Sequence, residues 1–104
     1  MGLSANKEYV ASLDIVTQTL KVFSSFNNEH LFDIQLTGMQ RPCGVHLTSD
    51  GVLVTDLRGG KLSEYSLSPS AEPIWTCNGL QEPSGITTDE SGFIYVTSSN
   101  MSII

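Results

Sequence analysis

The side chains best suited to chemistry in this sequence are a histidine, a turn aspartate and an aspartate that ends an apolar run. His46 could be a metal ligand, Asp50 with Gly51 could begin a calcium loop, and Asp56 could be catalytic. Each has a simpler interpretation: a packed histidine, a hairpin turn, and an acceptor of local backbone hydrogen bonds. The Asp50 turn lacks the spaced oxygen ligands of a calcium site, and no nucleophile triad, close carboxylate pair or phosphate-binding glycine loop is present. We therefore predict no catalytic residue, no metal site and no cofactor.

The two cysteines, Cys43 and Cys77, do not change this prediction. Their spacing fits no zinc site, and they are accompanied by two histidines, His30 and His46. Two cysteines are also too few for a disulfide scaffold. We expect both thiols to be reduced and to lie in or near the core.

These residues belong to a sequence that repeats internally. The segment LTGMQRPCG at 36–44 and the segment CNGLQEPSG at 77–85 carry Gly, Gln, Pro and Gly at the same places, 41 residues apart. The stretches that follow also align after a slip of one residue, so that Thr55 falls on Thr97. A period of about forty residues indicates a repeat architecture.

An earlier copy of the repeat is the segment EYVAS at 8–12. It lies 44 residues before the matching part of the next copy, so that Ser12 takes the place of Asp56. Ser98 takes that place in the third copy.

Each period contains signals for short strands separated by turns, and no stretch sustains a helical apolar period. The expected strands are 8–12, 20–25, 31–36, 44–48, 52–56, 62–67, 73–77, 85–89 and 93–98. Four short antiparallel strands per period of about 41 residues are typical of a β-propeller blade. The fold class is therefore all-β, a β-propeller fragment of four-stranded antiparallel blades in an incomplete ring.

We interpret residues 1–104 as a single propeller segment of about two and a half blades. With strands named a to d from the centre outward, 1–36 would hold strands b to d of the first blade and 37–77 a complete second blade. Residues 78–104 would hold strands a and b and the start of c. A ring needs about four to eight blades. Two copies of the chain would duplicate strands where they meet, so we expect a fragment of a longer propeller.

The repeat resembles the NHL repeat, with Pro-x-Gly, a glycine turn, an apolar strand and Thr in order. In the third copy the matching residues are Pro83, Gly85, Ile86, Gly92, Ile94, Tyr95, Val96, Thr97 and Asn100, and in the second they are Pro42, Gly44, Val45, Asp50, Gly51, Leu53, Val54, Thr55 and Asp56. The related YWTD propellers carry Trp where this chain has Val96. The resemblance covers most of the chain.

The resemblance implies a protein-interaction propeller, as at the C-terminus of tripartite-motif (TRIM-NHL) ubiquitin ligases, where it recruits substrate. Such a segment has no enzymatic role of its own. Two alternatives stay open: an RNA-binding NHL surface, and a fragment of a propeller lyase or lactonase.

In a propeller, the loops that join strands b to c and each blade to the next share one mouth of the ring. The candidate binding residues that this places together are Gln40, Arg41, Arg58, Lys61, Gln81, Glu82 and Asn100. Three of the five basic residues of the chain thus lie at one mouth, which predicts a rim for an acidic peptide or a phosphate backbone. The acidic turns at Glu29, Asp50, Glu72 and Glu90 belong to the opposite mouth.

The charge balance bears on the partner. Five Lys and Arg against eleven Asp and Glu give a net charge of −6, which opposes broad binding to nucleic acid or anionic lipid. A protein or peptide partner is therefore favoured over RNA, and no membrane partner is expected. Since neither a signal peptide nor a transmembrane segment is evident in the sequence, a cytoplasmic location is the expectation.

Overall fold

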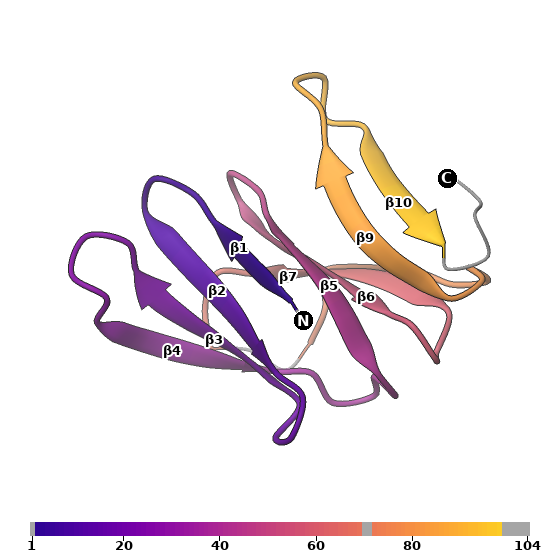
Figure 1. Cartoon of the computed structure of the whole chain (residues 1–104), viewed down its shortest axis with the longest axis horizontal. Coiled ribbons are helices and arrows are strands. Elements are labelled where there is room, and N and C mark those ends of the chain that lie inside the picture. Colours follow the sequence, from indigo (N-terminus) through magenta and orange to yellow (C-terminus); the bar gives the residue numbers. More distant parts are fainter. Residues whose placement is uncertain (1, 70–71, 99–104) are drawn as a thin grey trace.

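The chain consists of ten β-strands joined by turns, as described by a computed structural model of residues 2–69 and 72–98 (Figure 1). The strands are β1 (Leu3–Ala5), β2 (Tyr9–Asp14), β3 (Thr19–Ser24), β4 (His30–Gln35), β5 (Pro42–Leu47), β6 (Gly51–Asp56), β7 (Lys61–Ser66), β8 (Trp75–Cys77), β9 (Pro83–Thr88) and β10 (Ile94–Ser98). The all-β prediction is confirmed, and within these residues there is no helix that could cross a membrane.

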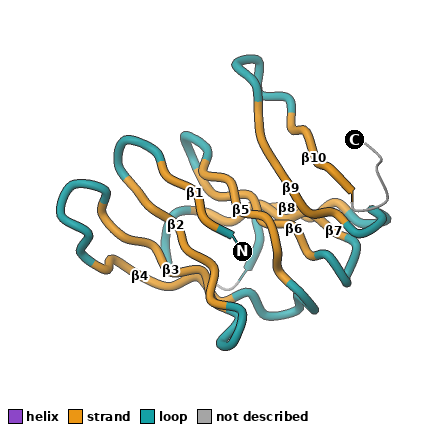
Figure 2. The backbone as a smooth tube through the Cα atoms, viewed as in Figure 1, coloured by secondary structure: helices purple, strands orange, loops and turns teal. Residues whose placement is uncertain are grey.

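The strands form three separate antiparallel sheets in chain order. The first sheet is β1–β2–β3–β4, the second is β5–β6–β7–β8, and the third is β9–β10. Every predicted strand is present, with ends that differ by no more than two residues. The inner strand β5 lies between β1 and β9, so that the sheets follow one another side by side (Figure 1, Figure 2). The strand expected after residue 98 falls outside the described residues.

The first sheet has four strands, and the prediction of only strands b to d for 1–36 is wrong. Leu3, Ser4 and Ala5 pair with Ser12, Ala11 and Val10 as an innermost strand. Three residues with one large apolar side chain carry little strand propensity of their own. The strand forms because β2, the next strand of the same hairpin, supplies a hydrogen-bonding edge, which the composition of these three residues does not predict.

The first repeat is also offset from the predicted alignment by two residues. Asp14 pairs with Thr19 across a four-residue turn, as Asp56 pairs with Lys61. The two turns share a left-handed residue at their fourth position, Gln18 with φ 53° and Gly60 with φ 66°. Asp14, rather than Ser12, is therefore the equivalent of Asp56, and the repeat between the first two sheets is 42 residues long.

The core lies between the sheets rather than within one of them. One apolar cluster fills the space between the first and second sheets, and a smaller one, around Leu53, Leu62 and Val96, joins the second to the third. Because the second sheet is covered on both sides, all six residues of β6 are buried. This explains why β6 reads as a continuous run, Val52 to Thr55, without polar alternation.

The inner strands approach one another at glycine. A Cβ on Gly2 would lie 2.8 Å from the carbonyl oxygen of Cys43, and a Cβ on Gly44 would collide with the carbonyl oxygen of Ser84. The hydroxyl of Thr55 accepts a hydrogen bond from the Gly44 N–H (2.8 Å) and donates one to the Ser84 carbonyl (2.9 Å). At Gly2 and at Gly44, a main-chain carbonyl of the next inner strand therefore packs against a glycine.

Candidate functional site: a braced basic rim

Asp56 organises the loops at the predicted binding mouth. Its carboxylate is buried at the end of β6 and accepts hydrogen bonds from the backbone N–H groups of Gln40 (2.8 Å), Arg41 (2.8 Å) and Gly59 (2.9 Å). Burial raises the pKa of Asp56, but these three donors, with the charge of Lys61, outweigh it and lower the pKa below 3.8. The carboxylate therefore accepts hydrogen bonds from two loops, as the sequence indicated.

Further contacts join these loops into one surface. The N–H of Leu57 donates to the carbonyl of Arg41 (2.8 Å), and the ammonium of Lys61 donates to the carbonyl of Gly38 (2.8 Å). The N–H of Leu80 donates to the carbonyl of Gly60 (2.9 Å), which reaches the loop before the third sheet. The backbone of the mouth is therefore held in place by its own hydrogen bonds.

The structure brings the predicted site residues together on this surface, which we call the basic rim. The residues of the basic rim are Gln40, Arg41, Arg58, Lys61, Gln81 and Glu82. All are exposed except Lys61, which is half-buried because its ammonium is bound within the rim. The seventh predicted residue, Asn100, lies outside the described residues. Neither Arg41 nor Arg58 forms an ion pair with a carboxylate within 2–69 and 72–98.

A hollow of about 480 Å³ adjoins the basic rim at Arg41. Its lining residues are Ser12, Leu13, Asp14, Ile15, Lys21, Arg41, Pro42 and Cys43. The hollow combines apolar side chains with the charged groups of Asp14, Lys21 and Arg41. The Lys21 ammonium is paired with Asp33 at 3.6 Å. Sequence reasoning did not assign the first-sheet residues to this mouth, because the offset of two residues hid the equivalence of the 15–18 turn with the Arg58 turn.

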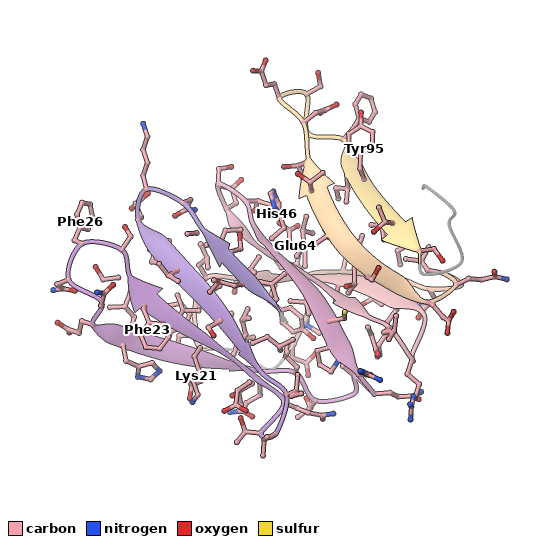
Figure 3. All side chains as sticks on the ribbon, in the orientation of Figure 1. Lys21, Phe23, Phe26, His46, Glu64 and Tyr95 are labelled. Carbon is pink, nitrogen blue, oxygen red and sulfur yellow. The ribbon has the colours of Figure 1, made fainter. Side chains whose placement is uncertain are left out.

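The opposite mouth is acidic and carries a hollow of larger volume. A hollow of about 630 Å³ lies among the turns that follow β1, β5 and β9. The ionisable side chains that line it are Lys7, Glu8, Asp50, Glu64, Asp89 and Glu90. Asp50 and Glu90 were assigned to this mouth from the sequence, and Figure 3 labels Glu64 on the second sheet at its wall.

The remaining candidates are engaged in packing contacts. The ring of His46 lies within 2.9 Å of the Thr88 hydroxyl, between the second and third sheets (Figure 3). Cys43 is half-buried, whereas Cys77 is exposed, so the prediction that both lie in or near the core is wrong for Cys77; its strand, β8, is the outer edge of the second sheet. Among the described residues no three His, Cys, Asp or Glu side chains are grouped to hold a metal ion.

Comparison with known proteins places the fold. No family model and no curated protein matches the chain. It superimposes on BamB from Moraxella catarrhalis with a TM-score of 0.77 at 13% identity, over 97% of this chain and 29% of that one. The glutaminyl cyclase of Myxococcus xanthus gives a TM-score of 0.70 at 14% identity, over 93% of this chain and 42% of that one. Both are β-propellers.

This chain is a β-propeller segment. It spans less than half the length of either propeller that it resembles. At these identities the likeness establishes the fold and leaves the function to be argued from the surface.

Proposed function

We propose that the chain is a protein-interaction segment and that the basic rim binds an acidic peptide segment of a partner protein. The observation that carries the proposal concerns Arg41 and Arg58, which lie on loops held by Asp56 and form no ion pair with a carboxylate among residues 2–69 and 72–98. A fixed backbone removes the cost of ordering the loop, and a planar guanidinium loses less side-chain entropy per hydrogen bond because it binds a carboxylate through two parallel hydrogen bonds.

The hollow beside Arg41 supports the same proposal. Leu13, Ile15 and Pro42 offer apolar contact next to Arg41, which suits a peptide with an apolar side chain beside an acidic one. The surroundings are acidic, with a net charge of −6 for the whole chain. An acidic ligand is therefore attracted locally at the rim and repelled elsewhere, which favours binding in one place.

The proposal also includes the type of propeller to which the segment belongs. We infer an NHL-type propeller of the kind found in tripartite-motif ubiquitin ligases, in which this segment recruits substrate and any ligation chemistry belongs to other domains. The support is the Pro-x-Gly repeat at Pro42 and Pro83 and the Thr that follows each. The free thiols of Cys43 and Cys77 are consistent with a reducing, cytoplasmic compartment.

The test measures binding of a library of fluorescent acidic–apolar peptides to the whole chain by anisotropy. We expect peptides with neighbouring acidic and apolar residues to be selected. The double variant Arg41→Gln/Arg58→Gln should weaken the best peptide by at least about tenfold, because each lost charge-assisted hydrogen bond contributes roughly 1.5–3 kcal/mol. The matched control Lys7→Gln removes one positive charge at the opposite mouth and should leave the affinity unchanged.

A second arm uses a single-stranded RNA oligonucleotide over a range of salt concentrations. Tight RNA binding with a steep salt slope, lost in the arginine double variant, would identify the rim as an RNA surface and refute the peptide proposal. Equal peptide affinity in the wild type and the double variant would also refute it.

A further inference from the structure

The loop that joins β8 to β9 contains an asparagine followed by a glycine, Asn78-Gly79, and both residues are exposed (Figure 2). Gly79 has a φ of 80°, and apart from its chain neighbours a Cβ built on it would meet no atom within 4 Å. Within 2–69 and 72–98, neither the side chain of Asn78 nor the N–H of Gly79 takes part in a hydrogen bond. The side-chain amide and the backbone nitrogen that follows it are therefore both accessible and without a partner there.

The other asparagines that the structure describes are engaged. The side chain of Asn6 accepts hydrogen bonds from two backbone N–H groups of its own turn (2.8 and 3.0 Å). The N–H that follows Asn27 is that of Asn28, and it donates to the carbonyl of Ser24 (2.9 Å). The N–H that follows Asn28 is that of Glu29, and it donates to the side chain of Asn27 (3.0 Å). Among the described asparagines, the pair Asn78-Gly79 thus differs in structure as well as in sequence.

An unhindered Asn-Gly pair can react with itself. The Gly79 nitrogen attacks Cγ of Asn78 and forms a new N–C bond, while its proton passes to a solvent base and the side-chain amide leaves as ammonia. The glycine favours this step because it has no Cβ beside the attacking nitrogen. Water then opens the five-membered imide at one of its two carbonyl carbons. The products are aspartate and isoaspartate, in which the main chain runs through the side chain, and both carry a new carboxylate.

The new carboxylate would lie beside the basic rim. The N–H of Leu80 donates to the carbonyl of Gly60 (2.9 Å), so the loop that contains Asn78 packs on the turn that carries Arg58. A negative charge in this loop would attract the guanidinium and repel an acidic ligand. Conversion of one neutral amide can therefore change the charge of the surface without any change in its backbone contacts.

We propose that Asn78 is a site of spontaneous deamidation and that the carboxylate formed there weakens binding of acidic peptides by the basic rim. The reaction requires the residues at 78 and 79 and water, and it releases ammonia. Its effect on binding rests on the proposed function, whereas the deamidation itself does not. The two parts are therefore tested by separate measurements.

The first measurement follows deamidation of the whole chain during incubation in buffer at neutral and mildly alkaline pH. Peptide mapping by mass spectrometry gives the extent of conversion at each asparagine, and protein isoaspartyl methyltransferase quantifies isoaspartate. We expect Asn78 to convert at least about tenfold faster than Asn6, Asn27 or Asn28 in the folded chain. The rate should rise with pH, because the attacking nitrogen must lose its proton. Asn78→Gln, which keeps an amide on a longer side chain, should show no comparable conversion.

Incubation in urea separates the contribution of the fold from that of the sequence. Unfolding releases the N–H groups that follow Asn27 and Asn28, so conversion there should accelerate, whereas the rate at Asn78 should change little. An Asn78 amide that persists in the folded chain but converts in urea would overturn the proposal, since the loop would then protect it. Equal rates at all asparagines of the folded chain would overturn it as well.

The second measurement compares peptide affinity by anisotropy. Asn78→Asp reproduces one product and should weaken the best acidic peptide roughly two- to fivefold, the size expected for an exposed charge interaction. Asn78→Gln is the neutral matched control and should bind like the wild type. Deamidation with unchanged affinity in Asn78→Asp would refute the effect on the rim. A wild type that binds no acidic peptide would refute the proposed function, and with it that effect, while the deamidation rates would still decide the modification site.

Discussion

Asp56 connects two loops: it accepts hydrogen bonds from Gln40 and Arg41 before β5 and from Gly59 in the turn after β6. We expect Asp56→Asn to destabilise the protein by about 1–3 kcal/mol, because the amide keeps one acceptor oxygen and turns an NH₂ group toward backbone donors. Urea denaturation at pH 7 measures the change. Asp14→Asn is the matched control: Asp14 accepts hydrogen bonds from Val16 and Thr17 within its own turn, and its loss should cost clearly less.

The same carboxylate makes stability depend on pH. The pKa of Asp56 is lower in the folded chain than its ordinary value of 3.8, so ionised Asp56 favours the folded state. Its contribution should be fully present above about pH 4 and should disappear as the pH falls below 3.8 through the folded pKa. The stability difference between wild type and Asp56→Asn should therefore be constant from pH 5 to 7 and shrink in stronger acid; a constant difference down to pH 2 would contradict the assignment.

At the scale of elements, the distance between neighbouring inner strands depends on glycine. We expect Gly44→Ala to destabilise the protein by at least about 2 kcal/mol, because the new methyl group collides with the backbone carbonyl of Ser84 and cannot be accommodated by a side-chain rotation. Thermal unfolding measures the loss. Gly85→Ala is the matched control, because its Cβ would meet one side-chain oxygen, that of Thr97, and no backbone. Equal losses for the two variants would mean that the close approach of β9 is unimportant.

The sequence predicted the strands well because their signals are local. Turn residues such as Asp50-Gly51 lie next to the strands. The Pro-x-Gly motif that begins at Pro42 recurs at Pro83, and this repeat aligned the second and third sheets. The strand β1 and the true offset of the first sheet escaped prediction, because both depend on pairing with β2 rather than on the residues themselves.

The candidate site was predicted only in part, because some of its residues lie on strands whose order was predicted correctly and others lie on the first sheet, whose offset was not. Arg41 and Arg58 were assigned to one mouth from the order of strands in a blade. The hollow beside Arg41 was not foreseen, since it requires the first sheet in its correct offset. The exposure of Cys77 was missed because free cysteines are usually buried, whereas β8 is an outer edge of three residues.

For the whole molecule, the two clusters of the core imply that the third sheet can separate without unfolding the rest. Leu53 belongs to the small cluster that holds the third sheet, and Val54, its neighbour on β6, belongs to the large one. We expect Leu53→Ala to cost about 2–4 kcal/mol in the attachment of β9 and β10. Hydrogen exchange should then accelerate at Ile86 and Val96 while β2 and β3 stay protected.

The matched variant Val54→Ala should accelerate hydrogen exchange mainly in the first and second sheets, because Val54 belongs to the large cluster. It removes contacts on the face of β6 toward the first sheet, so protection should fall there as well as in the second sheet. Uniform acceleration through all ten strands in both variants would mean that the chain unfolds as one cooperative unit.

The close approach of the inner strands at Gly2 and Gly44 limits the geometry of any propeller that contains this chain. Strand pairs elsewhere can vary their separation by exchanging larger and smaller side chains, but at Gly2 and Gly44 there is no side chain to exchange. How closely successive inner strands can approach one another is therefore limited at these glycines by the backbone carbonyls of Cys43 and Ser84, together with the side chains of Val45 and Thr55. Exposed positions on the outer strands can change without altering this spacing between inner strands, whereas a side chain at Gly2 or Gly44 would force the inner strands apart.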